Sequence, residues 1–199
     1  MKLLTWDDIL NIDEKSIKLI WYWSLLNENT HHEKHNYKAV IFYWFKRVYN
    51  LKIINDFINK KSVSYLWQYW ITCEEKIKSL INNNICALNC VCTWNTSEIV
   101  NWLCLEIEKN DLLDYSIREK QYNLVETKYD YVCPKTWKIE KTSEIAYVLV
   151  AKDEEIIANW IPFDKYHSNT RNWAYKLWEY FWKMFDETTY NVLWELVKK

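Results

Sequence analysis

The stretch that decides the fold is Ser16 to Leu26, which reads Ser-Ile-Lys-Leu-Ile-Trp-Tyr-Trp-Ser-Leu-Leu. Its first half, Ser16 to Ile20, is short, apolar and β-branched, which is typical of a buried strand. The residues that follow resemble a turn but include two indoles, where a chain reversal normally uses glycine. The composition shows the same imbalance, because the 199 residues include 14 tryptophans and no glycine. At average usage, a chain of this length contains about 14 glycines.

Several tryptophans stand in contexts that favour glycine. The dipeptide Asn-Trp, which with glycine would be the Asn-Gly turn signal, occurs at Asn101-Trp102, Asn159-Trp160 and Asn172-Trp173. Trp137 follows Pro134 at the glycine position of a type I turn, and Trp94 lies between two β-rich runs where a hairpin needs positive φ. We therefore hypothesise that these tryptophans are glycines, encoded by UGA codons that were translated as tryptophan. Frequent Lys, Ile, Asn and Tyr fit an AT-rich gene, and the alternative is a genuinely tryptophan-rich protein.

With glycine at these positions, Ile20 to Leu25 becomes Ile-Gly-Tyr-Gly-Ser-Leu. This resembles the signature loop of the γ-glutamylcyclotransferase-like family, including its ChaC-like and AIG2-like members, whose first strand ends in Tyr-Gly-Ser-Leu. The similarity continues in the family's order over roughly Ile17 to Tyr190. Its further segments are Tyr43 to Asn50 (Gly-Tyr-x-Arg-x-Phe-Asn in the family), Ala87 to Asn89, Asn101 to Leu103, Leu113 to Tyr122, and Asn172 to Thr189 in the closing helix.

The sequence predicts a single α+β domain over residues 1–199. Many strands with antiparallel turn signals favour a small mixed, mostly antiparallel β-barrel or curled sheet with peripheral helices, and the resemblance implies the same fold. Strands are expected at 16–20, 37–49, 52–58, 85–93, 98–107, 122–132 and 143–151. Helices are expected at 72–81, 109–118 and 172–185, and residues 1–15 are expected to form a surface segment or short helix.

The last predicted helix has two rows of side chains at helical spacing. Its apolar face consists of Leu177, Phe181 and Met184/Phe185. Ala174, Trp178 and Trp182 form a second row, which would be a seam of small residues if the tryptophans were glycines.

Charge and hydropathy narrow the class of partner. The formal net charge is −1, with 26 Lys and Arg against 27 Asp and Glu spread along the chain. Neither nucleic acid nor a membrane surface is therefore expected as a partner, and a small molecule is favoured. The first residues lack an apolar signal region and no run reaches the ~18 apolar residues of a membrane span, so a cytoplasmic location is expected. The sequence predicts no oligomeric state.

Two segments contain residue types that bind metals. Cys86 to Cys92 lacks the paired Cys-x2-Cys spacing of zinc ribbons, and its cysteines are expected to be reduced and largely buried. The polar run 27–36 contains His31-His32-x-x-His35, but no carboxylate or cysteine nearby in sequence completes a site, so a solvated loop is favoured. We expect neither a metal nor a cofactor.

The resemblance implies a reaction that needs no enzyme nucleophile. The α-amine of a γ-glutamyl group attacks its own side-chain carbonyl, 5-oxoproline forms, and the amine partner leaves. Because the amine is mostly protonated at neutral pH, a base must take its proton. Glu119, in the family's Arg-Glu-x-x-Tyr context, is the candidate catalytic residue, and Glu106, Glu108 and Glu126 are its rivals.

The resemblance also implies a substrate-binding turn. Backbone N–H groups of Tyr22, Trp23, Ser24 and Leu25 would converge on the γ-glutamyl moiety. An indole at Trp23 would keep the backbone from approaching the substrate closely.

Three functions compete. The leading interpretation is a γ-glutamylcyclotransferase-like enzyme that acts on a small γ-glutamyl peptide or amine; the amine partner could be the dipeptide of glutathione, another amino acid or a metabolite. A non-catalytic small-molecule binding protein on the same fold would need the pocket but not Glu119. Genuine tryptophans would instead suggest an aromatic-rich binding module with exposed indole platforms.

Overall fold

The computed structural model describes residues 2–21, 37–52, 85–133, 135–153, 161–162, 164–176, 178–191, 193 and 195–197. In chain order its elements are β1 (Leu3–Leu4), α1 (Trp6–Leu10), β2 (Ser16–Trp21), β3 (Tyr37–Tyr43), β4 (Phe45–Lys52), β5 (Ile85–Cys92), β6 (Ile99–Glu108), α4 (Lys109–Arg118), β7 (Tyr122–Val132), β8 (Ile139–Ala151), β9 (Ile161–Pro162), α5 (Asp164–Lys176), α6 (Glu179–Glu187) and β10 (Thr189–Tyr190).

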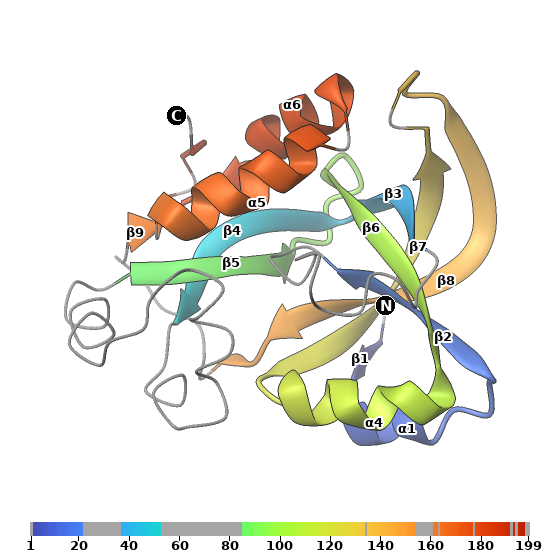
Figure 1. Ribbon diagram of the computed structural model, residues 1–199. Coiled ribbons are helices and arrows are strands. Elements are labelled where there is room, and N and C mark those ends of the chain that lie inside the picture. Colours follow the sequence, from blue (N-terminus) through green and yellow to red (C-terminus); the bar gives the residue numbers. More distant parts are fainter. Residues whose placement is uncertain are drawn as a thin grey trace.

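Strands β2, β3, β6, β7 and β8 close into a small barrel (Figure 1). β7 pairs with β3, β3 with β6 and β6 with β2, all antiparallel. β2 then runs parallel to β8, and the long antiparallel pairing of β8 with β7 closes the ring. Closure satisfies the strand edges that an open sheet would expose. The predicted mixed, mostly antiparallel barrel is confirmed.

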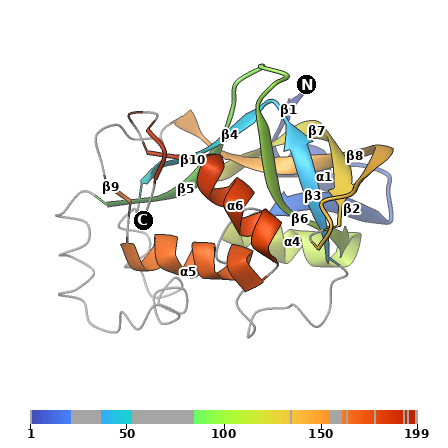
Figure 2. The ribbon, with the colours of Figure 1, turned by 90° about the horizontal axis from the view of Figure 1, so that it is seen from above.

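A second sheet lies beside the barrel and contains β10, β4, β5 and β9 in that order. β4 and β5 form its antiparallel centre, and β5 packs against β8 of the barrel. Helices α5 and α6 run along the β4–β5 pair, whereas α1 and α4 lie together at the opposite end of the molecule (Figures 1 and 2). The predicted peripheral helices therefore cover two separate regions.

A buried arginine joins the second sheet to the barrel and to α6. Arg47 on β4 is fully buried, and its guanidinium donates to Thr189 Oγ1 at 3.2 Å and to the Asn101 carbonyl on β6. Its Cζ lies 4.4 Å from the centroid of the Phe185 ring and 5.0 Å from that of Trp102. Burial lowers the pKa of Arg47 to about 10. The charge is stabilised by carbonyl oxygens and aromatic faces.

Several predicted elements of the barrel, the second sheet and the helices are confirmed within a few residues. Helix 109–118 and strand 122–132 match α4 and β7, and strands 85–93 and 98–107 match β5 and β6. Strand 143–151 is longer than predicted, because β8 begins at Ile139. The predicted strand residues 53–58, the helix 72–81 and the dipeptide Asn159-Trp160 lie outside the described residues.

The predicted strand 37–49 is wrong as one element. It is interrupted at Trp44, whose φ of 74° turns the chain out of the barrel strand β3 and into β4 of the second sheet. The β-rich pattern on both sides is continuous, so only the backbone angle marks the break.

The predicted helix 172–185 is also wrong as one element. The chain forms α5 and α6, with Trp178 between them at φ 124° and ψ 159°. The row of Ala174, Trp178 and Trp182 does not form, since Trp178 is outside both helices and 46% exposed. Phe181, Met184 and Phe185 are buried, as the apolar face predicted.

Two smaller expectations also fail. Asn101-Trp102 and Asn172-Trp173 are not turns but lie within β6 and α5. Residues 93–98 do not form a hairpin, because β5 and β6 belong to different sheets and the segment crosses between them.

The N-terminal segment is more integrated than the sequence suggested. β1 pairs with β7, and α1 begins with a capping box in which Thr5 and Asp8 bond reciprocally. Trp6 and Ile9 of α1 are buried. The N-terminal segment therefore packs onto the barrel. It also contains a short helix, which is one of the two structures expected for residues 1–15.

Candidate functional site

Glu119 lies at the corner where α4 ends and β7 begins. Leu112 and Tyr115 form the buried face of α4. Glu119 is the C-cap residue, and its N–H donates to the Tyr115 carbonyl at 2.8 Å. The Glu119 side chain is buried, with the whole residue 3% exposed. The corner thus places a carboxylate inside the protein at the end of a helix.

The backbone of this corner is held from two sides. The Glu119 carbonyl accepts hydrogen bonds from the Tyr122 N–H and from Trp6 Nε1, both at 3.0 Å. Trp6 belongs to α1, more than a hundred residues earlier in the chain. Sequence reasoning missed this contact; the capping box at Thr5 and Asp8 could have predicted the helix but not its neighbour.

One ion pair defines the electrostatics of the carboxylate. Arg118 Nε donates to Glu119 Oε1 at 2.8 Å, and the Arg118 guanidinium also lies 4.7 Å from the centroid of the Tyr115 ring. Burial raises the pKa of Glu119 to about 7, and the charge and hydrogen bond of Arg118 offset that rise only in part. A carboxylate that titrates near neutrality can both take and return a proton at physiological pH.

The strand register brings the end of β2 toward this corner. Ile20 pairs with Val148 in the parallel β2–β8 ladder, so β2 runs toward Ala151 at the end of β8. Ala151 in turn pairs with Tyr122, whose N–H bonds to Glu119. Trp21, where β2 ends, and Glu119, which precedes β7, therefore lie at the same end of the barrel, and β2 and β7 are the two strands that flank β8.

Polar residues of the second sheet also meet the barrel here. The Ala151 N–H donates to Asn89 Oδ1 at 3.0 Å, and Asn89 Nδ2 donates to Asn50 Oδ1 at 3.0 Å. Asn89 and Asn50 are buried on β5 and β4. The end of β8 is thereby fixed between the two sheets, which gives the Glu119 corner a rigid support.

The rival glutamates have different surroundings. Glu106 and Glu108 are exposed on β6, and Glu106 accepts a hydrogen bond from Ser16 Oγ at 2.6 Å. Glu126 is only half-buried on β7. Among the four candidates, Glu119 alone is buried.

The predicted substrate-binding residues Tyr22, Trp23, Ser24 and Leu25 lie outside the described residues, as do His31, His32 and His35. In the described part of the chain, no group of three or more His, Cys, Asp or Glu side chains is arranged to hold a metal ion. The described cysteines are free thiols, and burial raises the pKa of Cys86 and Cys104 to about 12. No helix among the described residues is long and apolar enough to cross a membrane.

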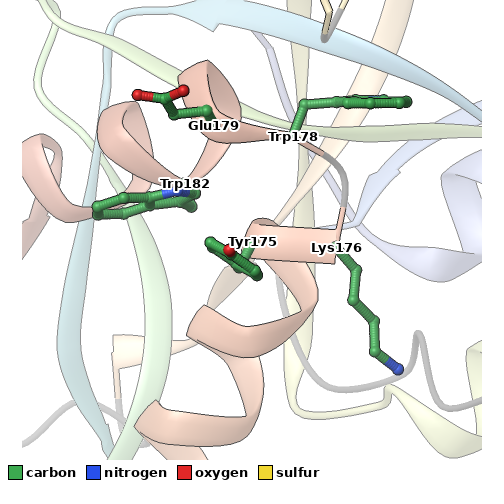
Figure 3. Close-up of a pocket in the computed structure, with 5 residues that line it drawn as sticks. All are labelled: Tyr175, Lys176, Trp178, Glu179 and Trp182. Carbon is green, nitrogen blue, oxygen red and sulfur yellow. The ribbon is translucent and has the colours of Figure 1, made fainter.

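A hollow between α5 and α6 is lined by Tyr175, Lys176, Trp178, Glu179 and Trp182 (Figure 3). The Tyr175 and Trp182 rings lie beside each other, with centroids 6.1 Å apart. Cations of the same chain cover both indoles: Lys135 Nζ lies 4.5 Å from the Trp178 ring and Arg171 Cζ 4.9 Å from the Trp182 ring. Trp182 is partly buried against the core, whereas Trp178 remains 46% exposed beside Lys135.

No protein-family model and no curated protein matches this chain. Solved structures are similar in fold at low sequence identity. An uncharacterized human protein is 13% identical with a TM-score of 0.48, covering 82% of this chain and 80% of the other. An Arabidopsis thaliana protein solved in solution is 12% identical with a TM-score of 0.41, covering 88% and 92%. A yeast γ-glutamyl cyclotransferase specific to glutathione is 12% identical with a TM-score of 0.43, covering 82% and 86%. Each of the three structures matches more than four-fifths of this chain.

Proposed function

We propose that this chain is a γ-glutamylcyclotransferase that converts the γ-glutamyl group of a small peptide or amine to 5-oxoproline, with Glu119 as its general base. One observation carries the proposal. Glu119, which the sequence resemblance assigns as the catalytic residue, is a buried carboxylate with a pKa near 7 at the end of the barrel where β2 ends. The rival glutamates Glu106, Glu108 and Glu126 are exposed or half-buried.

The reaction needs one proton carrier. Glu119 takes a proton from the α-ammonium group, and the freed nitrogen then bonds to the side-chain carbonyl carbon of the same γ-glutamyl group and releases its second proton to water. The bond from that carbon to the amine partner breaks, and Glu119 returns the proton to the departing nitrogen. No atom changes oxidation state. Because attacking and leaving groups belong to one molecule, positioning supplies much of the rate and the protein contributes proton transfer and oxyanion stabilisation.

The substrate-binding part of the proposal rests on Tyr22 to Leu25. Backbone N–H groups of this segment hold the γ-glutamyl moiety, and the chain enters the segment from Trp21 at the Glu119 end of the barrel. The proposal requires a close approach of backbone to substrate, so Trp23→Gly is the background in which activity is expected.

The test is 5-oxoproline release from a panel of γ-glutamyl peptides and amines that begins with glutathione. In the Trp23→Gly background, Glu119→Gln is expected to lower turnover by about 10²–10⁴-fold, since an amide keeps the shape but cannot take the proton. Substrate binding, measured by calorimetry, is expected to persist. Glu108→Gln is the matched control, because Glu108 is exposed at the other end of α4 and caps that helix without a side-chain bond.

Two results would contradict the proposal. Full activity of Glu119→Gln would assign the base to another residue. Binding of γ-glutamyl compounds with no 5-oxoproline from any variant would instead support a non-catalytic binding protein.

A further inference from the structure

Four described residues have a positive φ, and all four are tryptophan. They are Trp44 at 74°, Trp94 at 60°, Trp137 at 58° and Trp178 at 124°. The other described tryptophans lie in regular elements: Trp6 in α1, Trp21 in β2, Trp102 in β6, Trp173 in α5 and Trp182 in α6. Positive φ is uncommon for any residue with a Cβ and a genuine outlier for a bulky one, whereas glycine adopts it readily.

Backbone hydrogen bonds hold Trp44, Trp137 and Trp178 in place, as well as Thr93 next to Trp94. The Trp44 N–H donates to the Glu98 carbonyl at 2.8 Å, and the Trp44 carbonyl accepts from the Thr93 N–H at 2.7 Å. This ties the β3–β4 break to the β5–β6 crossing that contains Trp94. In the β7–β8 loop, the Trp137 N–H donates to the Cys133 carbonyl at 2.8 Å. The unfavourable angles are therefore required by the fold.

Trp178 is the most demanding of the four positions. Its φ of 124° and ψ of 159° lie in a region that essentially only glycine occupies. Both the Phe181 N–H and the Trp182 N–H donate to its carbonyl, which starts α6. The break between the two helices thus depends on a backbone conformation that a Cβ opposes.

The side chains do little to offset that cost at two of the positions. Trp94 is 68% exposed and Trp178 is 46% exposed, whereas Trp102 in β6 is fully buried against Phe181 and Phe185. Burial of an indole is what normally stabilises a tryptophan in a protein. We infer that residues 44, 94, 137 and 178 are glycines in the natural protein, encoded by UGA codons that its host reads as glycine.

The direct test is to sequence the gene and to measure the peptide masses of the natural protein. We expect UGA at codons 44, 94, 137 and 178, and peptides of the protein purified from its natural source with the mass of glycine at these positions. UGG codons, or natural peptides with the mass of tryptophan, would overturn the inference.

The conformational basis has a separate test that uses the chain as printed. Trp178 is replaced by Gly and, as a matched control, by Ala. The equilibrium constant for unfolding of the Gly variant is expected to be roughly 5- to 30-fold smaller than that of the Ala variant, because alanine retains the Cβ. The same difference is expected at Trp44, Trp94 and Trp137. At the control position Trp102, where φ is not positive, Gly is expected to be no more stable than Ala. Equal stability of Gly and Ala at Trp178 in denaturant titrations would overturn the argument. Neither test depends on enzymatic activity.

Discussion

Two buried carboxylates near opposite ends of β7 have pKa values that are shifted in opposite directions. Glu119, just before the strand, is 3% exposed, and Asp130, near its end, is 4% exposed. The pKa of Glu119 rises to about 7, whereas the pKa of Asp130 lies below its ordinary value. The two residues have nearly equal solvent exposure, but the Glu119 carboxyl is surrounded by more protein than the Asp130 carboxyl, so burial contributes to the difference in pKa.

Hydrogen-bond donors provide the rest of the pKa difference. Burial alone would raise the pKa of Asp130, but Lys141 Nζ at 2.7 Å, the Tyr43 hydroxyl and the Thr142 N–H at 3.2 Å all donate to its carboxylate and lower the pKa further than burial raises it. In the described part of the chain, Arg118 is the only donor to the Glu119 carboxylate. Donors to the charged form favour ionisation, and their scarcity leaves desolvation dominant.

Glu144, whose donors include the residues on either side of Asp130, shows the same effect of hydrogen-bond donors on a carboxylate pKa. Lys18, Tyr129 and Tyr131 all donate to its carboxylate and lower its pKa to about 2. A carboxylate saturated with donors remains a weak base and serves to link strands. The sparsely bonded Glu119 is the one suited to proton transfer.

The largest effect expected from this contrast is on catalysis. If Glu119 is the base, Glu119→Gln loses about 10²–10⁴-fold in turnover, while Asp130→Asn leaves turnover within a few-fold of the parent. The measurement is the initial rate of 5-oxoproline formation at pH 7.5 in the Trp23→Gly background. Equal losses in the two variants would show that the contrast in acidity has no bearing on catalysis.

The next effect is on the pH dependence of folding. The unfolded chain releases the Glu119 proton near the ordinary value of 4.5, but the folded chain keeps it up to about 7. The folded state therefore binds more protons in this window, and its stability falls as the pH rises from about 4.5 to 7, by about 3 kcal/mol in total. Urea unfolding at several pH values measures the slope.

Glu119→Gln is expected to remove that slope and to be the more stable variant at pH 8. Asp130→Asn should leave the slope unchanged, because the stability that ionised Asp130 provides is lost only as the pH falls below its ordinary value of 3.8. A parent protein with flat stability from pH 4.5 to 8 would contradict the raised pKa of Glu119.

A smaller effect, on the free energy of unfolding, is expected when the donors around Asp130 lose their acceptor. Asp130→Ala leaves Tyr43 and the Thr142 N–H without this oxygen and should destabilise the protein by about 1–3 kcal/mol at pH 7. Asp130→Asn keeps one acceptor oxygen and should recover part of that loss. If alanine and asparagine are equally tolerated, the donors are satisfied by water.

The smallest effect is expected at the exposed ion pair of Lys18 and Glu144, whose side chains are 26% and 43% exposed. Lys18→Met should cost under about 1 kcal/mol, because surface pairs are hydrated and screened. The difference from the parent should shrink in about 1 M salt. A loss of stability as large as that of Asp130→Ala would mean that the hydrogen bonds of Glu144 to Lys18, Tyr129 and Tyr131 stabilise the fold cooperatively.

The candidate site could be predicted from sequence only in part. Arg118-Glu119-x-x-Tyr122 stands at the end of the predicted helix 109–118, so both the motif and its position at the end of α4 were readable from the sequence. Trp6, Asn50 and Asn89 could not be assigned to the same region, because they meet at the corner only through α1 and the second sheet. Such contacts depend on strand order, which local patterns do not contain.

The sequence by itself determined the elements whose patterns are local. Runs dense in β-branched and aromatic residues predicted the barrel strands, and Leu112 and Tyr115 share one face of α4 at i, i+3 spacing. The absence of glycine beside 14 tryptophans also marked the turns as anomalous before any angle was known. Only the tertiary structure decided that Trp44 and Trp178 break continuous patterns, because a chain reversal is set by where the flanking elements pack. It also decided which carboxylate titrates near neutrality, since that depends on burial and on donors brought from distant strands.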